Sequence, residues 1–293
     1  MSRPRLATVV LSGCTGCHLS LLDAHEGLID LLAGVELVYS PLVDGDTFPG
    51  CDIALVEGAV GNERDERVLR EVRERSKVLI AMGSCAVLGG IGGLRNLYPR
   101  SAVLAEAYGD DVPGDGLPAL APSVRAVSDV VETDVEIPGC SVPTQMLVDA
   151  LTALLAGQPF VLPRRNLCAE CTRTKRVLLE HGRDFVSDAV YSVMELERID
   201  PARCFLEQGV ICLGPVTREG CGSRCLAGNM PCRGCMGPPQ RDFEQGAKMV
   251  DALAAILPAG AIMYLDDLVG TAYRYTLPVS YFPSLVTEEA GDE

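Results

Sequence analysis

The first half of the chain contains short apolar runs that are too brief to be buried helices. Runs of this kind, bounded by glycine and small polar residues, are typical of strands buried on both faces of a parallel sheet. Five runs predict strands: Leu6–Ser12, Val35–Tyr39, Ile53–Val60, Val78–Met82 and Val135–Ile137.

Segments of helical character lie between these runs. Apolar residues recur at helical spacing over Leu19–Leu32 and Thr144–Leu155, and Glu63–Arg75 predicts a charged helix. Thr144 is a candidate N-cap. Because strands and helices alternate, the sequence predicts an α/β fold with a doubly wound parallel sheet and helices on both faces.

The pattern changes near Pro159. Beyond it, helices are predicted only near Asp184–Leu196 and over Phe243–Ile256, while cysteine, glycine and proline become frequent. Within this region, the segment Cys221–Cys235 has little apolar content to fold around, so it needs a cofactor as its core, as small metal-binding domains do. We therefore expect an α/β domain at 1–158 and an irregular, cysteine-rich domain at 159–293.

Cysteine spacing provides the main chemical signal. Twelve of the 13 cysteines form three sets of four, and each set has a spacing that suits a cubane [4Fe–4S] cluster, which binds one thiolate per iron. Cys51 is left over and is expected to be structural. The sets are Cys14, Cys17, Cys85 and Cys140; Cys168, Cys171, Cys204 and Cys212; and Cys221, Cys225, Cys232 and Cys235.

The first set is scattered along the sequence but follows one structural rule. Cys14, Cys85 and Cys140 each come soon after the carboxyl end of a predicted strand. In an open α/β sheet these ends lie along one edge, where cofactors bind. Nearby glycines let the backbone approach a cluster and donate N–H groups to its sulfurs. The alternative is that Cys85 and Cys140 are small core residues, since free cysteine is often buried.

Zinc is the competing metal, because four thiolates also suit a tetrahedral zinc ion. Read alone, the four cysteines within the fifteen residues Cys221–Cys235 fit either metal. Three complete sets in one chain favour a redox chain over three independent structural zinc sites.

Other motifs carry weaker signals. Gly89–Gly93 matches neither common nucleotide-binding motif and predicts a tight turn beside the first cluster. His18 is expected either to hydrogen-bond a cluster or partner group or to pack, and His181 is a weak candidate cluster ligand. Glu57 is expected to accept backbone hydrogen bonds near the cluster, with proton relay as the alternative.

The overall composition narrows the functional class. The 293 residues carry a net charge of −15, which argues against binding to nucleic acid or to anionic membranes. No run approaches the ~20 apolar residues of a membrane span. Arg3 and Arg5 precede an apolar run, as in a twin-arginine signal, but they are not adjacent and no small-residue cleavage site follows. We therefore predict a cytoplasmic protein whose cysteines bind metal rather than form disulfides.

Several motifs, taken in order, resemble those of nickel–iron hydrogenase small subunits. They are SGCTGCH at Ser12–His18, VEG at Val56–Gly58, GSCA at Gly83–Ala86 and PGC at Pro138–Cys140. The later segments Cys204–Arg218 and Cys232–Pro238 are similar to the cytoplasmic, group 3-like enzymes of the viologen-reducing and soluble NADP-linked types. The resemblance runs from about residue 6 to about residue 240.

The resemblance implies a flavodoxin-like N-terminal domain and three [4Fe–4S] clusters. The nickel–iron centre would lie in a partner large subunit, so this chain would contribute no catalytic residue. By the family's order along the chain, the proximal cluster would be held by Cys14, Cys17, Cys85 and Cys140, the distal one by Cys168, Cys171, Cys204 and Cys212, and the medial one by Cys221, Cys225, Cys232 and Cys235.

Two departures from membrane-bound relatives bear on the electron acceptor. Cys168 stands where those relatives use histidine, and the medial set has four cysteines where theirs often has three. Thiolates at every iron should hold cluster potentials lower than neutral imidazole would. The implied acceptor is therefore a low-potential one, in a further subunit that contains flavin or iron–sulfur clusters.

Two other functions remain alternatives on sequence grounds. One is a cysteine-rich structural or regulatory protein that binds zinc. The other is a quinone-linked dehydrogenase subunit that shares the proximal-cluster domain. The second is disfavoured, because such subunits carry one cluster and no C-terminal cysteine set.

Overall fold

The chain forms two compact units. The computed structural model describes residues 3–41, 47–111, 114, 116–175, 190–191, 194, 199–240, 243–257 and 265–281. The first unit comprises residues 1–162 and 275–293, and the second comprises residues 163–274.

This division differs from the expected domains 1–158 and 159–293, because the chain returns to the first unit at Tyr275. Pro278 packs against two glycines that leave room for its ring. A Cβ atom at Gly89 would lie 2.4 Å from Pro278 Cγ, and one at Gly93 would lie 2.2 Å from the same atom. No local sequence signal predicts that the chain returns to the first unit at Tyr275. The packing of Pro278 depends on two glycines, which have no side chains, in a turn that is distant in sequence.

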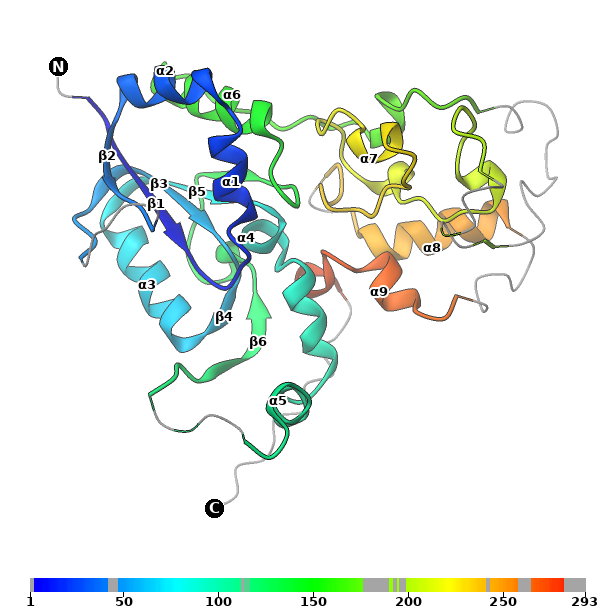
Figure 1. Ribbon diagram of the computed structural model, residues 1–293, viewed down its shortest axis with the longest axis horizontal. Helices are drawn as coiled ribbons and strands as arrows, with labels where there is room; N and C mark the ends of the chain where they lie inside the picture. The colour runs from blue at the N-terminus through cyan, green and yellow to red at the C-terminus, as the bar shows by residue number, and fades with distance from the viewer. Residues whose placement is uncertain are drawn as a thin grey trace. The chain divides into compact units, whose positions relative to one another are not determined.

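A five-stranded parallel sheet forms the centre of the first unit (Figure 1). Its order is β2-β1-β3-β5-β7. Counted in chain order within the sheet, this is the 2-1-3-4-5 order of flavodoxin-like folds, so the predicted fold class is confirmed. The strands are β1 (Arg5–Val10), β2 (Glu36–Tyr39), β3 (Cys51–Glu57), β5 (Ser76–Met82) and β7 (Val135–Ile137).

Helices cover both faces of this sheet (Figure 1). Helices α1 and α2 both contact α6, whereas α3 contacts β5 and buries Leu69 and Val72. The helices of the first unit are α1 (Gly16–Leu22), α2 (Glu26–Gly34), α3 (Glu63–Glu74), α4 (Ser84–Leu88), α5 (Arg100–Tyr108) and α6 (Thr144–Leu155).

Two helix predictions need correction. The apolar periodicity over Leu19–Leu32 belongs to two helices, because His25 adopts a positive φ of 50° and redirects the chain between them. Thr144 is not the N-cap of α6. Pro143 occupies that position, and its carbonyl accepts the helical hydrogen bond from the Leu147 N–H at 3.1 Å.

The predicted strand Ile53–Val60 is also divided. Gly58 has a φ of +94°, and a Cβ there would lie 2.7 Å from the carbonyl carbon of Leu11. Only glycine allows the chain to turn this close to the end of β1. Beyond it, β4 (Val60–Asn62) pairs antiparallel with β6 (Leu120–Arg125), a strand that the sequence pattern does not predict.

The described part of the second unit has little regular structure. It contains α7 (Arg224–Ala227), α8 (Gln245–Ile256) and α9 (Leu268–Ala272), and α8 confirms the helix predicted over Phe243–Ile256. The helix predicted near Asp184–Leu196 lies almost wholly outside the described residues. Phe205, Met249 and Leu253 form the core together with two cysteines, Cys212 and Cys232.

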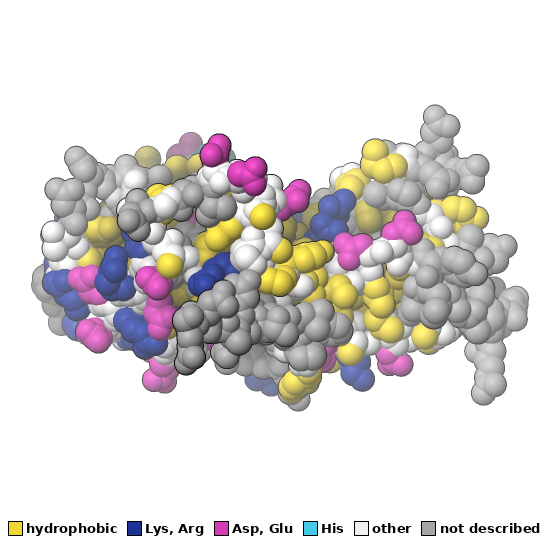
Figure 2. All heavy atoms as spheres, turned by 90° about the horizontal axis from the view of Figure 1, so that it is seen from below, with side chains coloured by type: hydrophobic (Ala, Val, Ile, Leu, Met, Phe, Trp, Pro, Cys, Tyr) yellow, Lys and Arg dark blue, Asp and Glu magenta, His cyan; other side chains and the backbone are white. Residues whose placement is uncertain are grey.

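The surface mixes charges of both signs. On the face drawn in Figure 2, basic and acidic side chains are interspersed. Examples on the first unit are Arg73 with Asp134 at 2.6 Å and Lys77 with Asp52 at 2.7 Å. Exposed pairs of this kind contribute only about 0–1 kcal/mol each. No helix in the described ranges is long and apolar enough to cross a membrane.

The sheet core gives a direct test of this architecture. Leu55 on β3 is fully buried, whereas Leu117 is 62% exposed. We expect Leu55→Ala to lower the free energy of unfolding by about 2–5 kcal/mol, because it leaves a cavity between strand and helices. The matched control Leu117→Ala should change it by less than about 0.5 kcal/mol. Denaturant unfolding followed by circular dichroism measures both, and equal midpoints would contradict the fold.

Candidate metal centres

The loops after three strands of one sheet edge carry the first cysteine set. Strand β3 ends at Glu57, between β1 and β5, and the loops after β1, β5 and β7 carry Cys14, Cys85 and Cys140. Backbone hydrogen bonds fasten the last two loops together. The Gly83 N–H donates to Ile137 O at 2.8 Å and the Ser84 N–H donates to Gly139 O at 2.9 Å. The topology therefore brings distant cysteines to one edge, as predicted.

Glycines leave room beside the sulfur atoms of this set. A Cβ at Gly83 would lie 2.3 Å from Cys17 Sγ, and one at Gly90 would lie 2.6 Å from Cys85 Sγ. Both glycines have positive φ, 91° and 64°, which L side chains rarely adopt. Gly89 and Gly90 form the tight turn that was predicted beside Cys85.

The thiols of the first set interact electrostatically. The pKa of Cys17 is raised to about 12, mainly by burial; a hydrogen bond from the Val142 backbone lowers it, and the charges of Glu57, Cys85 and Cys140 contribute to the rise. Burial likewise raises the pKa of the Cys85 thiol to about 11, followed by the charges of Cys140, Cys14 and Glu57. The Cys17 and Cys85 thiols are therefore protonated at neutral pH unless a cation stabilises their thiolates.

Tyr275 is a site residue that sequence reasoning missed. Burial raises the pKa of Cys140, the charge of Cys14 adds to this, and a hydrogen bond from the Tyr275 side chain lowers it. Tyr275 lies 135 positions after Cys140 and begins the segment that returns to the first unit. A lone tyrosine in a C-terminal segment carries no motif, so no local signal could have identified it.

His18 and Glu57 form a buried pair behind the first set. They are 1% and 2% exposed. Glu57 Oε2 accepts the backbone N–H of His18 at 2.8 Å and lies 2.6 Å from its ring Nδ1. The expected role of Glu57 as an acceptor of backbone hydrogen bonds is confirmed. His18 Nε2 is buried and has no hydrogen-bond partner among the described residues. His181, the weak candidate ligand, lies outside the described residues.

The second set converges around Gly214. A Cβ at this glycine would lie 3.4 Å from Cys168 Sγ and 3.6 Å from Cys212 Sγ. Burial raises the pKa of Cys212 to about 12, the backbone N–H groups of Gly214 and Cys232 lower it, and the charges of Cys168 and Cys204 raise it. Burial also raises the pKa of Cys168, and the charges of Cys204 and Cys171 contribute to the rise.

The third set is connected as two pairs. Burial raises the pKa of Cys221, with a contribution from the charge of Cys225. Burial also holds the pKa of Cys232 well above its usual value, with contributions from Cys212 and Cys235. The Cys232 N–H donates to Cys212 Sγ at 3.3 Å, so the second and third sets touch.

Arg173 fastens the loops of the second and third sets. It is 6% exposed, and its guanidinium carbon lies 3.8 Å from the centre of the Phe205 ring. Its guanidinium donates to Arg203 O at 2.9 Å, Leu226 O at 3.3 Å and Asn229 Oδ1 at 2.6 Å. These contacts neighbour Cys204 and Cys225 in sequence. Nothing in the sequence pattern separates Arg173 from the other basic residues near Cys171.

The donor sets suit iron–sulfur clusters. Each offers soft thiol ligands, and glycines beside several sulfurs leave space for a bulky group. Within the described ranges, no three His, Cys, Asp or Glu side chains are grouped to bind one shared metal ion.

Comparison with known families connects this architecture to redox proteins. Residues 14–154 match the family described as NADH ubiquinone oxidoreductase, 20 Kd subunit. This span contains the whole first set and none of the second or third. The match therefore covers the domain that quinone-linked and hydrogenase subunits were expected to share, and it does not extend to the second unit.

Relatives that cover nearly the whole chain are hydrogenase subunits. A subunit of the vhu F420-non-reducing hydrogenase of Methanocaldococcus jannaschii is 39% identical over 94% of this chain and 95% of its own length. The iron-sulfur subunit of the F420-non-reducing hydrogenase of Archaeoglobus profundus is 30% identical, with 94% and 96% covered. A chain of the solved NAD+-reducing [NiFe]-hydrogenase in the H2-reduced state aligns with a TM-score of 0.53 and 36% identity over 55% of this chain and 96% of that one.

Gly83 provides a test of the first site. We expect Gly83→Ala to displace Cys17, because the new Cβ would lie 2.3 Å from its sulfur. The iron content of the purified protein should then fall by about four atoms per chain, which is the content of one cubane. Gly92→Ala is the control, since a Cβ there meets nothing within 4 Å. Equal iron contents in the two variants would show that the first set holds no cluster.

Proposed function

Because the chain belongs to the family of nickel–iron hydrogenase small subunits, we propose that it carries electrons through three [4Fe–4S] clusters between a large subunit and a low-potential acceptor. The chain is thus part of an oxidoreductase that acts on H2, with the catalytic site in the partner large subunit. The observation that carries the proposal is the convergence of a complete four-cysteine set at one edge of the sheet, followed by eight further cysteines in the second unit.

Each cysteine set is assigned to one cluster in this proposal. The clusters supply one-electron storage, and the chain supplies thiolates, backbone N–H groups and a buried environment that fixes their potentials. Bound clusters would supply a route for electrons from the proximal site through the medial site to the distal site. The ligands in that order are Cys14, Cys17, Cys85 and Cys140; Cys221, Cys225, Cys232 and Cys235; and Cys168, Cys171, Cys204 and Cys212.

The proposed acceptor is a further subunit that contains flavin or iron–sulfur clusters. Thiolate ligands at every iron favour low potentials, which suit such carriers better than quinones. The names of similar proteins support a multi-subunit enzyme with its own electron acceptor. One relative is a subunit of an F420-non-reducing hydrogenase, and one solved structure is described as an NAD+-reducing hydrogenase. A cytoplasmic location is part of the same proposal.

The surface beside the first set suits a large partner. Cys14 and Cys140 are exposed in the chain alone. On helix α1, Leu19 is 57% exposed and Leu22 is 44% exposed, one helical turn apart and soon after Cys17. Apolar side chains next to an exposed cofactor site are typical of a surface that another chain covers. We propose that the large subunit packs here.

Metal and sulfide analysis tests the cofactor assignment. Anaerobic purification with its partners should give about twelve iron and twelve sulfide per small subunit, together with one nickel per large subunit, because three cubanes each hold four of both. Zinc with little sulfide would reject the electron-transfer function and favour the alternative of a structural zinc protein.

Substitutions on α1 test the partner surface. Leu19→Asp combined with Leu22→Asp should weaken association with the large subunit at least about tenfold, since burying each leucine contributes about 1.5–3 kcal/mol. Co-purification and a binding titration measure this. The iron content should stay unchanged, and Leu117→Asp, another exposed leucine, should bind normally. Undiminished binding by the double variant would place the large subunit elsewhere.

A further inference from the structure

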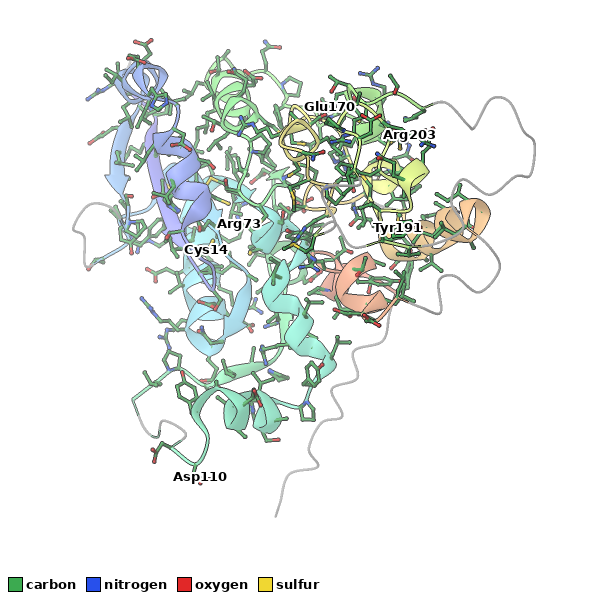
Figure 3. The ribbon with its side chains drawn as sticks, turned by 45° about the vertical axis from the view of Figure 1, so that its right-hand side comes forward. Cys14, Arg73, Asp110, Glu170, Tyr191 and Arg203 are labelled. Atoms are coloured by element: carbon green, nitrogen blue, oxygen red, sulfur yellow. The ribbon has the colours of Figure 1, made fainter. Side chains whose placement is uncertain are left out.

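A carboxylate from the second cysteine loop reaches the third cysteine set. Glu170 lies between Cys168 and Cys171, and Figure 3 shows it among the loops of the second unit. Its Oε1 lies 3.6 Å from Cys221 Sγ and accepts the Ser223 N–H at 3.2 Å. Its Oε2 accepts the Gly220 N–H at 3.1 Å. The carboxylate therefore contacts the residues on both sides of Cys221 and the sulfur itself.

The position of Glu170 is fixed by its surroundings. Besides the two backbone donors, the Ser223 hydroxyl donates to Glu170 O at 3.2 Å. The pKa of Arg165 is raised mainly by its hydrogen bond to Glu219 and by the charge of Glu219, and the charge of Glu170 adds to the rise. The ion pair of Arg165 is with Glu219, at 2.9 Å, and its side chain is largely exposed. Among the described residues no ion pair joins Glu170 to a basic group, so its negative charge is held against a sulfur.

The Glu170 carboxylate affects how readily a cluster bound at the third set would accept an electron. The Glu170 carboxylate lies 3.6 Å from Cys221 Sγ, the atom that would bond one iron of a cluster at the third set. Reducing a cluster adds one electron that its sulfur ligands share. A fixed negative charge a few ångströms away makes that addition less favourable.

We propose that Glu170 lowers the reduction potential of the cluster held by Cys221, Cys225, Cys232 and Cys235. The residue is a positioning group, because it acts through Cys221 and touches no substrate. The inference rests on the proposed function, since it requires a cluster at the third set. Glu170 lies in the two-residue spacer between Cys168 and Cys171. This spacer would therefore act on the third-set cluster, to which Cys168 and Cys171 contribute no ligand.

The test is a redox titration of the intact complex. Glu170→Gln keeps the size of the side chain and one oxygen acceptor but removes the charge. Anaerobic titration followed by electron paramagnetic resonance should show one cluster whose reduced-to-oxidised ratio at a fixed potential rises about tenfold, which corresponds to about 59 mV for one electron. Cys225→Ala, which removes one ligand of the third set, identifies the signal that belongs to this cluster.

Two further variants separate charge from geometry. Glu170→Asp keeps the charge. The reduction potential of its third-set cluster should therefore lie closer to that of the unsubstituted protein than the potential in Glu170→Gln does. Asp251→Asn removes the same charge from an exposed position on α8 and should leave all three potentials unchanged, because solvent screens it. An unshifted third-set potential in Glu170→Gln, or equal shifts in the Gln and Asp variants, would overturn the inference.

The outcomes distinguish this inference from the proposed function. If the unsubstituted complex holds about twelve iron and shows three cluster signals, and Glu170→Gln leaves the potentials unchanged, the inference fails while the electron-transfer function stands. If the unsubstituted complex shows no cluster signals, the proposed function itself fails.

Discussion

Parallel strands that end along one edge of a sheet bring the first four cysteines together. The order β2-β1-β3-β5-β7 makes β1, β3, β5 and β7 direct neighbours, so the loops after three of them meet beside Glu57 at the end of the fourth. Gly58 and Gly83 allow these loops to approach each other more closely than any side chain would permit. The remaining features of this site, including the buried His18–Glu57 pair and the contribution of Tyr275, depend on that convergence.

The second unit holds its cysteines in a different way from the first. Its described part has little regular structure, and two of its cysteines, Cys212 and Cys232, are part of the core. Burial raises the pKa of both thiols, so without a cation they remain neutral and act as small apolar side chains. A metal cluster would turn the same thiols into bonded cross-links between loops that have little regular structure.

Much of this could be predicted from the sequence, because the relevant signals are local. The apolar runs predicted the strands of the central sheet, and the position of Cys14, Cys85 and Cys140 after strand ends predicted their convergence. Other features depend on distant packing. The end of β3 at Gly58 requires the proximity of Leu11, the return of Tyr275 requires the glycines under Pro278, and the reach of Glu170 to Cys221 requires two loops that share no motif.

The central claim is that twelve cysteines sort into three quartets, each around one iron–sulfur cluster. Diffraction from the anaerobic complex at the iron absorption edge tests it most directly, since anomalous scattering locates iron independently of any chain tracing. We expect three separate groups of iron, each surrounded by the sulfur atoms of one quartet named above. Iron shared between different quartets, or anomalous signal at the zinc edge in its place, would contradict it.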